Sequence, residues 1–183
     1  MAIKNKVVSN PKTGQDIRFI RTSKDTNGEI LEMESTYRAH SKAPAAHYHP
    51  YQEEDFVVVT GEVTVSIRGQ LKVLRQGDKL NIPPNTVHSM WNESDSVAVV
   101  NWKVQPAMNT EFLLEMVNGL AGDGKTNAAG MPNILQVALM VNNFTDEFRL
   151  SKPPFIIQKI LFLILTPFAY LSGYKPVYRK YID

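Results

Sequence analysis

Hydrophobic and polar positions divide the chain into two regions with different periods. Up to Pro106, short apolar runs alternate with turn residues, which is the pattern of an all-β protein. We expect eight strands in this region, at residues 16–22, 29–39, 55–61, 62–69, 70–78, 79–83, 87–92 and 97–104. In the fourth strand, Val63, Val65 and Ile67 fall on one face by their spacing of two. Eight short strands at close spacing predict a β-barrel or jelly roll.

After residue 106 the apolar positions follow the longer period of helices. We expect three helices, at residues 109–120, 131–144 and 153–173. Pro132 stands near the start of the second helix, where proline is tolerated. Pro167 should kink or end the third helix, because proline cannot donate the helical hydrogen bond. The predicted organisation is a β-barrel over residues 1–106 and a helical C-terminal extension over residues 107–183.

The third predicted helix is unusually apolar, since residues 160–174 contain no charged side chain. A membrane span needs about 20 apolar residues, and this stretch is shorter and holds a proline and a glycine. We therefore expect the helix to be buried against the barrel or a second subunit, in a homodimer whose tail covers apolar surface. The less favoured alternative is an interfacial membrane helix followed by the cations Lys175, Arg179 and Lys180.

Composition narrows the classes of protein that need considering. The 183 residues are 43% hydrophobic and 21% charged, as in ordinary globular domains. A net charge of +2 without a dense basic stripe argues against a nucleic-acid partner. The absence of cysteine excludes disulfides, thiolate metal sites and cysteine nucleophiles. The first 16 residues lack the apolar core of a signal peptide, so a cytoplasmic location is expected.

Candidate chemistry is concentrated in residues 47–61, "HYHPYQEEDFVVVTG", where two of the four histidines stand one residue apart beside the densest acidic cluster. On an extended segment the side chains of His47 and His49 point to the same face. Pro50 interrupts the strand and resets its alternation. Glu54 can then share the inward face with the two imidazoles, whereas its acidic neighbours at 53 and 55 should face solvent.

A third histidine, His88, opens a strand after a Pro-Pro-Asn turn and can approach the same point from elsewhere in the barrel. Three imidazoles and one carboxylate suit iron, manganese, nickel, cobalt, copper or zinc better than calcium or magnesium. We predict one divalent transition-metal ion bound by His47, His49, Glu54 and His88, with two coordination positions left for water or substrate. The alternative is that these residues form a solvated polar loop.

At these residues the sequence resembles the cupin superfamily. The first cupin motif, G-x5-H-x-H-x3,4-E-x6-G, is matched from His47 to Gly61, with Ser41 in place of its first glycine. The second motif, G-x5-P-x-G-x2-H-x3-N, is matched from Gly77 to Asn92, with Asn85 in place of its middle glycine. Neither departure touches a ligand, and asparagine tolerates left-handed backbone better than most residues.

The resemblance covers roughly residues 16–106 and implies a mainly β fold, the cupin double-stranded β-helix or jelly-roll barrel, with C-terminal α-helices added to it. It implies a metal-binding protein that acts on or binds a small molecule in the barrel. One hypothesis is a metal-dependent oxygenase or isomerase, in which Glu54 could also leave the metal and act as a catalytic base. The other is a non-catalytic small-molecule-binding or sensing module with a structural or ligand-fixing metal.

Several other features have a functional and a plainer interpretation. Four apolar residues could line a pocket near the metal or simply form core: Phe56, Val58, Met90 and Trp102. The stretch "GLAGDGKT" at 119–126 fits a phosphate-binding loop, but a helix rather than a strand precedes it, so we interpret it as an inter-helix loop. His40 is expected in a turn or at the rim, Tyr48 and Tyr51 at the rim, and Gln52 is a minor candidate for a place near the metal.

Overall fold

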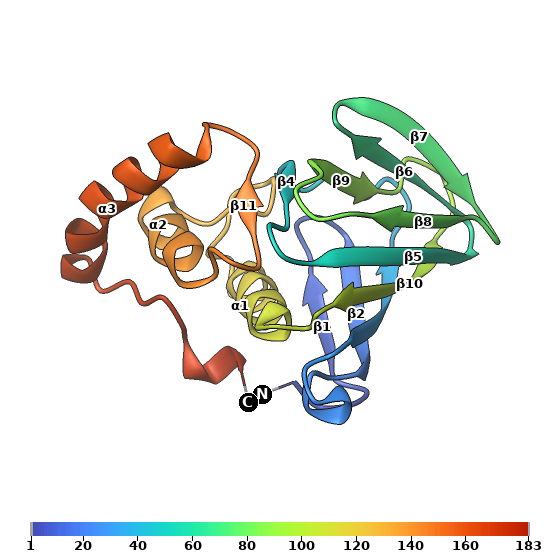
Figure 1. The fold of residues 1–183 in the computed structure, drawn as a ribbon, viewed down its shortest axis with the longest axis horizontal. Helices are drawn as coiled ribbons and strands as arrows, with labels where there is room; N and C mark the ends of the chain where they lie inside the picture. Colours follow the sequence, from blue (N-terminus) through green and yellow to red (C-terminus); the bar gives the residue numbers. More distant parts are fainter. Residues whose placement is uncertain (1, 183) are drawn as a thin grey trace.

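The computed structural model describes residues 2–182 and contains two antiparallel β-sheets followed by three helices (Figure 1). One sheet has the order β1 (Val7–Asn10), β2 (Gln15–Arg21), β3 (Leu31–Tyr37), β10 (Ala98–Gln105), β5 (Glu53–Thr60) and β8 (Lys79–Ile82). The other has the order β11 (Arg149–Leu150), β4 (His47–Tyr48), β9 (His88–Trp91), β6 (Glu62–Ile67) and β7 (Gln70–Arg75). The eight predicted strands are confirmed, and β1, β4 and β11 are additional.

The main core lies between the two sheets. It combines inward residues of β5 and β10 with inward residues of β6, β7 and β9 (Phe56, Val58, Ala98, Val100, Val63, Val65, Leu74 and Met90). The predicted alternation in β6 is confirmed at Val63 and Val65, which are buried, while Ile67 is half-buried against the same core. Period-two burial of this kind is what two sheets packed face to face require.

Two turns depend on left-handed backbone. Gly61 joins β5 to β6 with φ +73°, and an added Cβ there would lie 2.6 Å from the carbonyl oxygen of Val97. Asn85, in the turn before β9, has φ +62°, as expected for asparagine in place of a motif glycine. Its backbone N–H donates to the carbonyl of His49 at 2.8 Å, so this turn also holds the segment that follows β4.

The tail forms the three expected helices, α1 (Thr110–Gly122), α2 (Ile134–Asn143) and α3 (Phe155–Leu171), with 3-10 turns at Lys24–Thr26 and Arg179–Tyr181 elsewhere in the chain. Of the two expectations for Pro167, an end of the helix is wrong, because α3 runs through it to Leu171, and a kink stays a prediction. Proline removes the partner of the carbonyl four residues earlier, that of Leu163. Since Leu163 is exposed, water can replace that hydrogen bond.

The helical tail is joined closely to the sheets. Its two-residue strand β11 pairs with β4 and becomes the edge of the five-stranded sheet. The buried side chain of Gln52 donates hydrogen bonds to the carbonyls of Pro106 and Ala107 and to the hydroxyl of Thr110. The division into two domains at residue 106 stays a prediction, but the tail contributes both a strand and a buried junction to the β-region.

Helix α3 is the outermost element on its side of the molecule, with α2 between it and β11 (Figure 1). Only a narrow stripe of α3, including Phe162 and Ala169, is buried, and Phe162 packs against Val137 and Val141 of α2. Of the two expected covers for this helix, the barrel is wrong, because α2 fills that place, and the second subunit stays a prediction. Among residues 2–182, no helix is both long and apolar enough to cross a membrane.

Candidate metal centre

Three histidines from the five-stranded sheet meet at one point. Strand β4 pairs with β9 so that His47 lies directly opposite His88, and His49 follows just after β4. One ring nitrogen from each of His47, His49 and His88 lies within 4.8 Å of the others. His49 and His88 are buried and His47 is half-buried. The structure thus brings together the three imidazoles that the spacing singled out.

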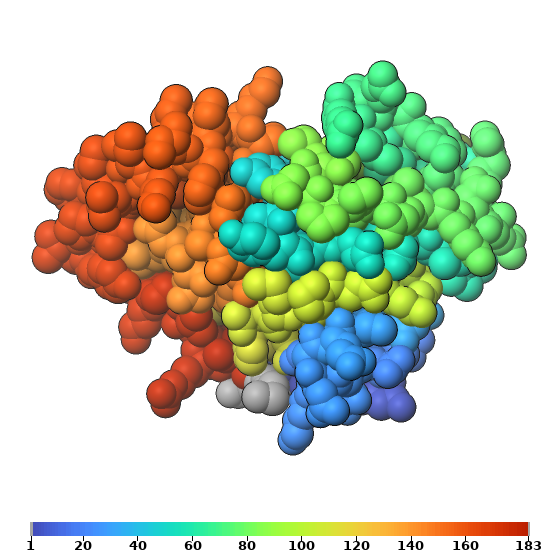
Figure 2. Space-filling model, in the orientation of Figure 1, coloured from blue at the N-terminus to red at the C-terminus, as the bar shows by residue number. Residues whose placement is uncertain are grey.

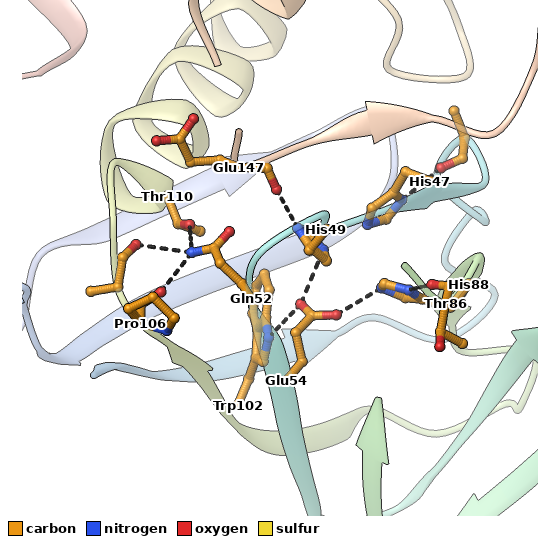
Figure 3. A network of polar contacts seen from close by, with 12 residues as sticks. His47, His49, Gln52, Glu54, Thr86, His88, Trp102, Pro106, Thr110 and Glu147 are labelled. Atoms are coloured by element: carbon orange, nitrogen blue, oxygen red, sulfur yellow. Dashed lines mark hydrogen bonds and ion pairs between the residues drawn. The ribbon is translucent and has the colours of Figure 1, made fainter. Parts of the chain in front are cut away.

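Each of these imidazoles is oriented by a backbone carbonyl at its Nδ1 atom (Figure 3). The acceptors are Ala45 for His47 at 2.8 Å, Thr86 for His88 at 2.9 Å and Glu147 for His49 at 2.5 Å. A carbonyl only accepts hydrogen bonds, so the proton of each neutral ring lies on Nδ1. The Nε2 atoms of His47 and His49 are then left with the lone pairs that a metal ion needs, whereas Nε2 of His88 faces the Glu54 carboxylate at 2.8 Å and must lose its proton before it can bind an ion.

Glu54 completes the cluster from the facing sheet. Its side chain is 1% exposed, and its carboxylate oxygens lie 2.8 Å from Nε2 of His88 and 3.4 Å from Nε2 of His49. The indole Nε1 of Trp102 donates to the same carboxylate at 2.9 Å. The residues on either side of Glu54, Glu53 and Asp55, are more exposed and point to the other face of β5, as the alternation predicts.

The electrostatics match the states that metal ligands adopt at His47 and Glu54, but not at His88, where the shift favours the protonated ring. Burial alone would raise the pKa of Glu54, but the adjacent imidazoles of His49 and His88 outweigh it and hold that pKa at about 2. Burial, together with the two neighbouring histidines, lowers the pKa of His47 to about 3. Burial opposes a charge on His88 too, yet its contact with Glu54 raises its pKa. A carboxylate with so low a pKa suits metal binding better than proton abstraction.

The donor set fits a transition-metal ion. Nε2 of His49 and the Glu54 oxygen beside His88 are buried without an aligned hydrogen bond, although both lie close to other cluster atoms. Buried polar atoms without partners are costly, and an ion bound at the centre would satisfy both. His47, His49, His88 and Glu54 would hold it, as three nitrogen donors and one oxygen donor. Such an ion supplies Lewis acidity or redox chemistry.

Trp102 is a positioning residue for this centre, and Trp102→Phe tests it. The ring of Trp102 stacks on Phe56 with centroids 5.8 Å apart, so phenylalanine keeps much of the packing and loses only the donor to Glu54. Loss of a partner behind a ligand should weaken metal affinity about tenfold, measured by competition with a chelator of known affinity. Trp91→Phe is the control, because the Trp91 indole donates to Glu93 on the surface. Equal affinities in the two variants would contradict this role.

The helical tail also contacts two of the candidate metal ligands, His47 and His49. The sequence did not predict these contacts. Besides the Glu147 carbonyl on His49, the ring of Phe148 stacks on His47 with centroids 4.7 Å apart and planes at 26°. The Glu147 side chain is itself held by the backbone N–H and the amide of Asn109 at the start of α1. A two-residue strand has almost no sequence signature, and only the apolar alternation of Phe148 and Leu150 hints at it.

A cavity of about 210 Å³ opens beside the histidines. From the β-region it is lined by Tyr37, Phe56, Met90 and Trp102 among others, so three of the four candidates line the cavity as well as packing in or against the core, whereas Val58 is core alone. Its remaining wall comes from the tail, mainly from apolar side chains of α1 and α2 (Leu113, Leu114, Val117, Val137, Met140, Val141 and Phe144). The four candidate metal ligands therefore face a cavity that is enclosed jointly by the sheets and the helices.

For His40, Gln52 and residues 119–126, the structure supports the plainer of the two interpretations given from the sequence. His40 sits at the surface, paired with Asp95, and adopts the positive φ of a turn residue. Gln52 points to the junction with α1 rather than to the metal cluster, as Figure 3 shows. Residues 119–126 form the end of α1 and the turn after it, with no strand before them.

The serine in place of the first motif glycine has an identifiable contact. The Ser41 hydroxyl accepts from the backbone N–H of Asn92, the last residue of the second motif, at 2.8 Å. The amide of Asn92 in turn donates to three backbone carbonyls nearby. The departure at Ser41 therefore still links the two motifs, away from the metal cluster.

A jelly roll of two antiparallel sheets with three histidines and a glutamate in its interior defines the cupin class of proteins. A comparison with known protein families supports this class, because residues 33–103 match the family model of the cupin domain. The chain belongs to the cupin superfamily. A solved RmlC-like cupin from Shewanella frigidimarina superposes with a TM-score of 0.50 at 20% identity, over 58% of this chain and 88% of that one, which supports the fold.

Two curated relatives extend the comparison. Quercetin 2,3-dioxygenase of Bacillus subtilis is 35% identical over 78 residues, which is 42% of this chain but only 23% of that protein. A probable oxidoreductase of Hypocrea virens, virH, is 30% identical over 151 residues, covering 75% of this chain and 67% of the relative. The second likeness extends well beyond the length of the matched cupin domain.

Proposed function

We propose that this cupin is a metal-dependent oxygenase that acts on an uncharged, largely apolar molecule of one or two rings. The observation that carries the proposal is the position of the metal-ligand cluster at the wall of an apolar cavity. The metal, held by His47, His49, Glu54 and His88, would bind and activate a substrate or oxygen at its open positions. The surrounding residues orient the substrate and exclude water.

The lining of the cavity supports this substrate class. Within the part of the chain that the structure describes, its only ionisable lining residues are the three histidines, Glu54 and Tyr37. No lysine or arginine lines it, so the metal ion would be the only counter-charge for a phosphate or carboxylate, and the rest of such an anion would lie against apolar side chains. Burial raises the pKa of Tyr37 to about 12, so this tyrosine can offer a neutral hydroxyl to a substrate oxygen.

The size of the cavity sets an upper bound on the buried part of the substrate. An apolar cavity of roughly 150 Å³ holds one benzene molecule. A volume of about 210 Å³ is therefore suited to a single substituted ring or a small fused pair. Apolar lining with few polar groups is the usual composition of sites for such molecules.

The curated relatives favour an oxygenase over an isomerase. One is named a quercetin dioxygenase and the other a probable oxidoreductase. This chain spans under a quarter of the first relative, so the substrate of that whole protein is only a starting point for a search. Two of the ligand states also support the proposal, because a neutral His47 and an ionised Glu54 need lose no proton when the metal binds, whereas His88, with its raised pKa, must lose one.

Oxygen uptake tests the proposal. The protein, loaded in turn with iron, manganese, nickel, cobalt, copper and zinc, is offered flavonols, small phenols, cyclic 1,3-diketones and sugar phosphates. We expect uptake with a neutral ring substrate, at least about a hundredfold above that of His49→Ala, and none with sugar phosphates. Tight binding of a ring compound without turnover under any metal would indicate the non-catalytic binding module instead. Turnover of sugar phosphates alone would contradict the proposal.

The other expectations from the sequence concern partners and location. A homodimer and a cytoplasmic location stay predictions. A role for Glu54 as a base, in addition to that of a ligand, also stays a prediction, although its low pKa makes the ligand role the better supported one.

A further inference from the structure

The outward surface of α3 is apolar to an unusual extent. Large hydrophobic side chains along the helix are exposed, among them Leu163 at 72% and Leu171 at 86%. The others are Ile156, Ile157, Ile160, Leu161, Ile164, Phe168 and Tyr170. At 100° per residue they extend over about half of the helix circumference. We call these nine residues the outer face of α3. In the space-filling view, this orange helix forms the outer side of a lobe beside the β-region (Figure 2).

The charged residues between positions 149 and 182, which include α3, all have one sign. Residues 149–182 contain six cations and no Asp or Glu, whereas residues 1–148 contain 14 Lys and Arg against 17 Asp and Glu. Three of the six flank or lie on α3, namely Lys152 before it, Lys159 on it and Lys175 after it, and all three are exposed. An apolar helix face with exposed lysines on it and at both ends complements a surface that is apolar inside and anionic at its boundary.

A second copy of the chain would cover this face less well. A two-fold dimer pairs the same patch with itself, so Lys152, Lys159 and Lys175 of both chains would be brought near one another without an acid to offset them. Two packed helices also cover only a stripe of each other, narrower than the exposed arc. A lipid surface has neither limitation, because acyl chains conform to the whole arc and anionic headgroups pair with the cations.

We propose that the outer face of α3 docks on an anionic membrane surface. The helix lies parallel to the bilayer plane, with Leu163 and Leu171 in the apolar region and the three flanking lysines among the headgroups. It does not cross the bilayer, since it is too short. The inner stripe of α3 stays packed against α2, so the rest of the protein is carried at the surface.

Flotation of the full-length protein with lipid vesicles tests this inference. We expect co-flotation with vesicles of phosphatidylcholine mixed with phosphatidylglycerol, and much less with phosphatidylcholine alone. The double substitution Leu163→Gln and Leu171→Gln should lower the partition coefficient at least about tenfold, since two large side chains no longer gain from leaving water. Substituting glutamine for Lys152, Lys159 and Lys175 should lower the partition coefficient about fivefold per lysine. Added salt should also lower the partition coefficient, because it screens the attraction to anionic headgroups.

A matched control substitutes two exposed apolar residues elsewhere. Leu71→Gln and Val73→Gln change the outer side of β7, where Leu71 is 67% exposed, and should leave flotation unchanged. Metal content of each variant confirms that the fold is retained, and does so independently of any activity. The inference is overturned if the wild-type protein floats with neither vesicle. It is also overturned if the wild type is a dimer that ignores vesicles and that Leu163→Gln with Leu171→Gln makes monomeric.

Discussion

His88→Ala abolishes metal binding while the two sheets stay folded. The substitution removes one of three converging imidazoles and leaves Glu54 without its contact at 2.8 Å. The core between the sheets is apolar and holds none of the four ligands, so its packing does not depend on the ion. We expect metal content to fall from about one ion per chain to below a tenth of that, in protein purified with and without added metal. Elemental analysis gives the content, and circular dichroism checks the fold.

His40→Ala is the control for this experiment. His40 is a histidine of the same chain, but it pairs with Asp95 at the surface and lies outside the cluster. Its replacement should leave the metal content unchanged. The ligand assignment is wrong if the change at His40 removes the metal, or if the change at His88 leaves the affinity intact.

Two truncations that differ by four residues separate the roles of β11 and α3. A chain ending at Leu150 keeps the Glu147 carbonyl on His49 and the Phe148 ring on His47, whereas a chain ending at Asp146 loses both. Loss of a partner that orients a ligand usually weakens metal affinity about 10- to 100-fold, and we expect a decrease of that size only in the shorter chain. Competition with a chelator of known affinity measures it.

Each truncated chain serves as a control for the other, because both lack the same residues after Leu150. Both lack α3 and expose the same side of α2, including Val137 and Val141, so both should be less soluble than the full chain to a similar degree. If the two bind metal equally well, the tail does not support the metal centre through β11. If the longer chain already fails to bind metal, α3 rather than β11 carries the effect.

The β-region was largely predictable because its signals are local. Alternating apolar positions, as in Val63 and Val65, report which face of a strand is buried, and glycine or asparagine in the turns reports left-handed backbone. The metal cluster was predictable for a related reason. His47 and His49 share a face by spacing alone, and the break at Pro50 brings Glu54 onto that face. The arrival of His88 from another strand was a weaker expectation from its place at the start of a strand, and the resemblance to cupins strengthened it.

The contribution of the tail was not predictable, because one of its contacts to the site is made by a backbone carbonyl and the other, by the Phe148 ring, comes from a segment with almost no sequence signature. The acceptor for His49 is a backbone carbonyl, which any residue at position 147 would supply. Strand β11 is two residues long and exists only because β4 offers it a free edge. The location of α3 was also open, since a hydrophobic pattern shows that a helix needs cover and does not show which element provides it. Here α2 had already taken the place beside the sheets.

The hydrogen bond from His49 to the Glu147 carbonyl makes metal occupancy and the position of the tail parts of one thermodynamic cycle. Whatever free energy the docked tail adds to metal affinity, the bound ion must add to tail docking, because the coupling between two equilibria is reciprocal. Phe148 and Leu150, which follow Glu147, form part of the wall of the cavity beside the histidines, together with α1 and α2. A chain without its ion would therefore open that wall more often and become a better target for proteases, so that metal supply would regulate how much of the protein persists as well as how much of it is active.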